Sequence, residues 1–123
     1  MSVLLFSREA SGPEEKHEQI IESFVPKLKV ETYRTMGSLL DRLHQPLLDI
    51  NIAILFAGSR EELLEIVSIK DLLSTLRIIL VLPDNKRDTV SLGLRLQPRF
   101  VSYADSDFKD IGAVLGRMLG DSK

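Results

Sequence analysis

The chain has 123 residues, close to the length of one typical domain, and its 16 basic and 18 acidic side chains give a formal net charge of −2. This balance gives no overall case for nucleic-acid or membrane-surface binding. The absence of cysteine excludes disulfides, thiolate catalysis and cysteine-ligated metals, and it is consistent with a reducing compartment.

The apolar runs are too short for a membrane helix. The longest one, residues 52–57, falls far below the roughly 20 residues that such a helix needs. The first run ends at the charged pair Arg8 and Glu9, so no signal peptide is visible. We therefore expect a single cytoplasmic domain over residues 1–123.

The first half of the chain alternates short apolar runs with amphipathic segments. Residues 3–6 are continuously apolar, as in a strand that is buried on both faces. Residues 11–26 carry a proline in their first turn and apolar side chains at helical spacing, which predicts a helix. Residues 28–33 alternate apolar and polar, which favours a strand near a sheet edge. Residues 36–44 predict a short helix.

The middle of the chain repeats this alternation. Residues 52–57 predict a second fully buried strand. Ser59 and Glu62 have capping-box spacing, which predicts the start of a helix that continues to Leu73 and is apolar over a wide arc. Residues 78–82 predict a third buried strand.

The last part of the chain completes the pattern. Residues 87–96 predict a helix, although the even spacing of their apolar side chains would also suit a strand. Residues 100–103 predict a fifth strand. A final helix begins at Ser106 or Asp107 and has the cleanest helical spacing of the chain.

Strict alternation of strands and helices predicts an α/β fold, a three-layer doubly wound sandwich with a parallel sheet and helices on both faces. Five strands in a chain of this length suit the flavodoxin-like strand order 2-1-3-4-5. The three fully apolar strands would be central in that order, and the two mixed strands would form its edges.

This arrangement resembles the receiver domain of bacterial response regulators over nearly the whole chain. The resemblance rests on the order and spacing of elements, most clearly from Leu76 to the last helix, and not on motif identity. In the family, two acids after strand 1 hold Mg²⁺ and an aspartate at the end of strand 3 takes the phosphoryl group. A hydroxyl residue ends strand 4 and a lysine ends strand 5, so that metal and ammonium neutralise the developing charge.

None of those residues is present at the matching positions of this sequence. The acid pair falls on Ser7 and Arg8, and the phosphate acceptor falls on Phe56, or on Ala57 if the register shifts by one. The remaining positions fall on Leu82 or Pro83 and on Tyr103. The resemblance therefore implies a degenerate member, a pseudo-receiver that keeps the fold without the phosphorylation site.

A pseudo-receiver of a two-component system would be a non-catalytic signalling module without a cofactor or metal. It would act by protein–protein interaction or as a homodimer, and its partner would be a sensor kinase, another regulator or an output domain. We expect no nucleic acid or membrane among its partners. The face implied by the resemblance comprises Lys86, Arg95, Phe100, Tyr103, Lys109 and Arg117.

A different class of function, binding of a small anionic ligand or nucleotide, is the main alternative. In the predicted fold, Ser7, Arg8, Ser59 and Arg60 meet where strands 1 and 3 end, beside the switch point at which such folds bind ligands. A helix N-terminus after Ser59 would add positive partial charge. The alternative interpretation is one helix cap and two solvated arginines.

Metal binding and catalysis are less favoured. Glu9, Asp84 and Asp105 come from three loops on this rim and could hold Mg²⁺, but acids in turns and caps are far commoner. The only histidines, His17 and His44, lie on different predicted helices away from the rim. A flavodoxin-like enzyme is the third hypothesis, disfavoured because the rim lacks a nucleophile with a nearby base.

Overall fold

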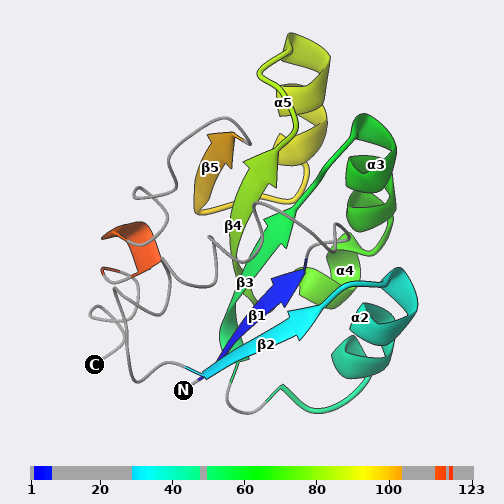
Figure 1. The fold of residues 1–123 in the computed structure, drawn as a ribbon, viewed down its shortest axis with the longest axis vertical. Coiled ribbons are helices and arrows are strands. Elements are labelled where there is room, and N and C mark those ends of the chain that lie inside the picture. Colours follow the sequence, from blue (N-terminus) through cyan, green and yellow to red (C-terminus); the bar gives the residue numbers. More distant parts are fainter. Residues whose placement is uncertain (1, 7–28, 48–49, 104–112, 116, 118–123) are drawn as a thin grey trace.

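The computed structural model describes residues 2–6, 29–47, 50–103, 113–115 and 117 (Figure 1). Within these residues five strands form one parallel sheet in the order β2-β1-β3-β4-β5, which confirms the predicted order. The strands are β1 (Ser2–Phe6), β2 (Lys29–Tyr33), β3 (Ile50–Phe56), β4 (Arg77–Leu82) and β5 (Phe100–Tyr103).

One face of the sheet is covered by a row of helices (Figure 1). They are α2 (Met36–Leu43), α3 (Arg60–Ser68), α4 (Lys70–Leu73) and α5 (Arg87–Leu94). The helical residues 113–115 lie on the other face, where Leu115 is fully buried. The predicted helix over residues 11–26 and most of the final helix lie outside the described residues.

The two-residue period of the strands divides the core into two layers. On β1, for example, Leu4 and Phe6 pack under the row of helices, whereas Val3 and Leu5 pack on the opposite side with Leu115. The same alternation divides the side chains of β3 and β4. This burial on both faces explains why the central strands are continuous apolar runs, and why β2 and β5 at the edges are more mixed.

Two helices begin at a hydroxyl cap, of which the sequence predicts the one at Ser59. Thr35 accepts a hydrogen bond from the backbone N–H of Ser38, and Ser59 accepts one from Glu62 at 3.2 Å. The second half of the capping box is shifted by one residue, because the Glu62 carboxylate accepts from the N–H of Gly58 and not from that of Ser59.

The single helix predicted from Ser59 to Leu73 is wrong, because the structure breaks it at Ile69. That residue leaves helical geometry, with φ −109° and ψ 20°. The break lets the chain turn so that Leu73 and Leu76 enter the core before β4 begins. The apolar arc is also wider than the buried face, since Leu64 remains 52% exposed.

Helix α5 packs on β4 through small side chains and not through its evenly spaced leucines. Thr89 and Gly93 are its buried residues, whereas Leu94 is 55% exposed. A Cβ atom added at Gly93 would lie 2.9 Å from a methyl carbon of Leu80 and 3.0 Å from one of Leu82. The helix therefore approaches the sheet as closely as it does because residue 93 has no side chain.

Two helical glycines allow this contact to be tested with one kind of substitution. Gly37→Ala on α2 meets no atom within 4 Å and should stabilise the protein by about 0.4–1 kcal/mol. Gly93→Ala gains the same helix propensity but presses on two buried leucines, so we expect a net loss of about 1 kcal/mol or more. Urea unfolding of both variants measures the difference. Equal stabilisation by the two substitutions would contradict the close packing of α5 on β4.

Candidate functional site at the carboxyl edge of the sheet

Three of the positions predicted to match the phosphorylation site of receiver domains lie at the carboxyl edge of the sheet. Phe56 ends β3 and is 9% exposed, Leu82 ends β4 and is fully buried, and Tyr103 ends β5 and is half-buried. Leu82 is directly opposite Tyr103 in the ladder. Ala57 extends the β3–β4 pairing by donating its N–H to the Val81 carbonyl at 3.0 Å, and it too is buried.

A chain of polar contacts lies beside these strand ends. Arg60, at the start of α3, donates to the hydroxyl of Thr89 on α5 at 3.4 Å. Thr89 is fully buried, and its hydroxyl donates to the Asp84 carboxylate. The contacts link the loop after β4 to the first turns of α3 and α5.

Asp84 is held in its charged form by its surroundings. The backbone N–H of Lys86 donates to its Oδ1 at 2.9 Å. This hydrogen bond, followed by the one from Thr89 and the nearby charges of Lys86 and Arg60, lowers the pKa of Asp84. The carboxyl edge therefore already contains an anion, the Asp84 carboxylate. It lies near Arg60, the residue that was expected to bind an anionic ligand.

The structure describes two of the four residues of the predicted anion pocket. Ser59 and Arg60 lie at the carboxyl edge as expected, but Ser59 caps α3 and Arg60 contacts Thr89. Ser7 and Arg8 lie outside the described residues, so the pocket stays a prediction.

The remaining candidate residues for metal binding and catalysis are scattered. Among the residues that the structure describes, no cluster of three or more histidine or acidic side chains could hold a metal ion. Glu9, Asp105 and His17 lie outside these residues, and His44 is an exposed residue at the end of α2.

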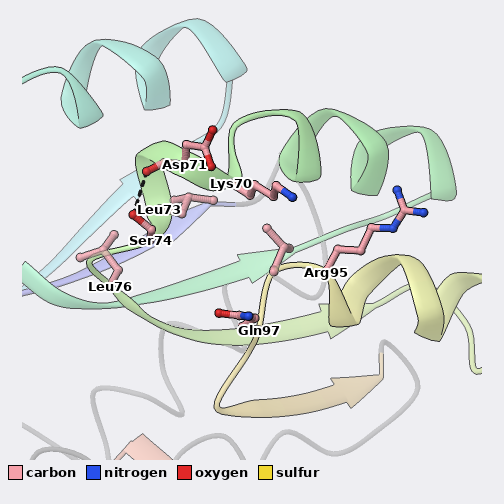
Figure 2. Close-up of a pocket in the computed structure, with 8 residues that line it drawn as sticks. Lys70, Asp71, Leu73, Ser74, Leu76, Arg95 and Gln97 are labelled. Carbon is pink, nitrogen blue, oxygen red and sulfur yellow. Dashed lines mark hydrogen bonds between the residues drawn. The ribbon is translucent and has the colours of Figure 1, made fainter.

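The residues expected on a partner face come from several elements of the fold. Phe100 and Tyr103 are half-buried on the edge strand β5, and Lys86 and Arg117 are exposed. Lys109 lies outside the described residues. Arg95 follows α5, and its side chain extends away from β5 on the side of α3 (Figure 2).

Sequence reasoning missed the most exposed apolar side chain of α5. Leu94 lies one helical turn after the half-buried Val90, so the two share a flank of α5, opposite to that of Arg95. On β5, Val101 and Tyr103 are half-buried and pack against the same core layer as Val90. The even spacing of the leucines did not indicate which side of α5 is exposed. The burial of Gly93 and Thr89 in the structure shows which side faces the sheet.

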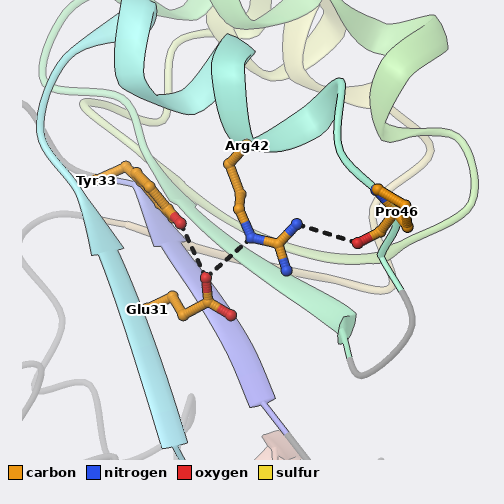
Figure 3. A network of polar contacts seen from close by, with 4 residues as sticks. All are labelled: Glu31, Tyr33, Arg42 and Pro46. Carbon is orange, nitrogen blue, oxygen red and sulfur yellow. Dashed lines mark hydrogen bonds and ion pairs between the residues drawn. The ribbon is translucent and has the colours of Figure 1, made fainter.

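A second polar network joins helix α2 to the edge strand β2 (Figure 3). The Glu31 carboxylate accepts from Tyr33 at 2.8 Å and from Arg42 at 3.0 Å, and Arg42 also donates to the Pro46 carbonyl. Burial, then the hydrogen bond to Glu31, then the charge of Glu31 raise the pKa of Tyr33. These groups satisfy one another, so we assign this network to holding α2 against the sheet.

No protein-family model matches the sequence. No curated protein matches it significantly either. Within the described part of the chain, no helix is long and apolar enough to cross a membrane.

Solved structures share its fold over nearly its whole length. The RcsB response regulator of Salmonella typhimurium superposes with a TM-score of 0.76 at 18% identity, over 98% of this chain and 60% of that one. This chain thus spans less than two thirds of RcsB. The signal receiver domain of a DNA-binding response regulator (merR) from Colwellia psychrerythraea 34H gives 0.73 at 16% identity, over 98% of both chains. A putative pilus assembly protein (cpaE) from Burkholderia thailandensis gives 0.73 at 18% identity, also over 98% of both.

These likenesses agree with the strand order and the placement of the helices. The protein has the fold of response-regulator receiver domains, a flavodoxin-like five-stranded parallel sheet of order 2-1-3-4-5 with helices on both faces.

Proposed function

We propose that the chain is a receiver-like signalling module that works without phosphorylation of an aspartate and acts by contact with another protein. The observation that carries this proposal is the chemistry of the carboxyl edge. Phe56, Leu82 and Tyr103 occupy the strand ends where a receiver needs a carboxylate, a hydroxyl and an ammonium group.

These three residues cannot perform the family's reaction. Phosphoryl transfer needs an anionic nucleophile in line with the phosphoryl group and cations that neutralise the developing charge. Phenylalanine and leucine side chains offer neither a nucleophile nor a hydrogen-bond donor. The phenol of Tyr103 carries no positive charge and cannot replace a lysine ammonium. The nearby Arg60 and Asp84 contact the buried Thr89 instead.

Without a covalent signal, recognition of a partner becomes the simplest activity of this fold. We place it on the α5–β5 face, defined as Val90, Leu94, Val101 and Tyr103. Leu94 is one of two large apolar side chains that are strongly exposed among the described residues, and the other three are half-buried. An apolar centre next to the uncharged edge strand β5 favours docking of a protein.

The partner class follows only from likeness to the neighbours. Because several similar structures are receiver domains of response regulators, a sensor kinase, another regulator or an output domain is the partner that we favour, in the cytoplasm of a bacterium. The likeness to a putative pilus assembly protein extends this range beyond transcriptional regulation. A second copy of this chain is the partner that can be tested without knowing the pathway.

Acetyl phosphate tests the absence of phosphorylation directly. We expect the intact mass of the protein to stay unchanged after incubation with acetyl phosphate and Mg²⁺, because no strand end offers a carboxylate. A receiver that carries the acceptor aspartate serves as the positive control. Gain of one phosphoryl group that Asp84→Asn abolishes would contradict the proposal and would identify Asp84 as a displaced acceptor.

The two exposed leucines provide a matched test of the α5–β5 face. If two copies pair through this face, Leu94→Glu should weaken self-association at least about tenfold, because it places a charge in an apolar contact. Leu64→Glu makes the same change on α3, outside the face, and should leave self-association unchanged. Sedimentation velocity over a concentration series measures both. A wild-type chain that stays monomeric, or equal effects of the two variants, would argue against pairing through this face.

A further inference from the structure

A hollow of about 220 Å³ lies between α4 and the end of α5 (Figure 2). Leu76 immediately precedes β4 and Gln97 shortly precedes β5, so the hollow is at the amino end of the sheet. It is therefore separate from the carboxyl edge, and its lining shares no residue with the α5–β5 face. Its lining residues are Lys70, Asp71, Leu73, Ser74, Leu76, Arg95, Leu96 and Gln97.

Two cations border this hollow from different segments of the chain. The side chains of Lys70 and Arg95 extend to the same side of it, and both residues are exposed. Across the described ranges, neither side chain forms an ion pair or hydrogen bond with another described residue. The one acid in the lining, Asp71, lies beside Ser74, whose hydroxyl donates to the Asp71 carbonyl at 2.9 Å. The side toward Arg95 is therefore positively charged.

The floor of the hollow is apolar. Leu73 is fully buried, and Leu76 and Leu96 are nearly so. Their side chains belong to the core layer under the helices, so the floor is fixed by the packing of the sheet. A ligand would therefore find a small and rigid apolar surface, provided by Leu76 and Leu96 at 8% and 6% exposure, next to the two cations.

Gln97 occupies a backbone position that ordinarily favours glycine. Its φ is +52°, the left-handed region, and it is the one non-glycine residue there in the described part of the chain. Glycine is the usual residue just after a helix in this conformation, since any Cβ atom is strained. The sequence instead places an amide side chain in the lining of the hollow. Retained strain of this kind points to a function for the side chain.

We propose that this hollow binds a small molecule that carries a phosphate monoester next to an apolar group. Lys70 and Arg95 match the double negative charge of the phosphate, and the planar guanidinium of arginine can donate to two of its oxygens at once. The Gln97 amide donates a further hydrogen bond, and the leucine floor receives the apolar group. The mixture of a few polar groups with an apolar wall is typical of ligand sites.

Phenyl phosphate is a suitable probe at constant ionic strength. We expect a saturable titration of backbone amide signals near Lys70, Leu96 and Gln97, with a Kd at or below about 1 mM. Inorganic phosphate, which lacks the apolar group, should bind at least about tenfold more weakly. Shifts that do not saturate, that centre on the carboxyl edge, or that inorganic phosphate reproduces with equal affinity would overturn the proposal.

Matched variants separate this site from general attraction to a positive surface. Arg95→Gln should weaken binding of phenyl phosphate about tenfold or more, whereas Arg87→Gln removes an exposed arginine from the start of the same helix and should have no effect. Gln97→Gly should raise the Tm, because it relieves the left-handed backbone, and should also weaken binding. Equal losses in the two arginine variants, or unchanged affinity in Gln97→Gly, would contradict the proposed site.

Discussion

Burial of the central strands on both faces is the constraint on which the rest of the structure depends. β3 is hydrogen-bonded to β1 on one side and to β4 on the other, and its side chains contribute to both core layers. Each fully buried leucine or isoleucine stabilises such a core by roughly 1.5–3 kcal/mol. Because a parallel sheet that is apolar on both faces needs helices on both, this one requirement determines the layers.

The same apolar character extends to the carboxyl ends of the strands, where this fold usually keeps its chemistry. Phe56 and Leu82 continue the core up to the edge, and the polar groups nearby form an internal chain from Arg60 through Thr89 to Asp84. We infer that the protein acts through binding surfaces on this fold and not through chemistry at the strand ends. Helix α5 is central to that account, because one flank borders the α5–β5 face and the other borders the hollow near Arg95.

The sequence predicts the strands and their order well, because a strand that is buried on one face alternates apolar and polar residues, whereas a strand that is buried on both faces is a continuous apolar run. It predicts helix limits less well. The break at Ile69 follows from where the chain must return to the sheet, which local spacing does not encode. The exposure of Leu94 was hidden because the contact of α5 with β4 is made by Gly93 and Thr89, residues that carry no hydrophobic signal. Gln97 was missed for a similar reason, since a left-handed backbone is visible only in the structure.

We propose above all that the carboxyl edge does not bind a phosphoryl group. The most direct test of this proposal is a backbone amide NMR spectrum recorded with and without Mg²⁺ and beryllofluoride, which mimics an aspartyl phosphate. We expect no saturable shift for the amides at the ends of β1, β3 and β4. Amide signals there that shift and saturate together would contradict the proposal and would place the protein among the phosphorylated switches.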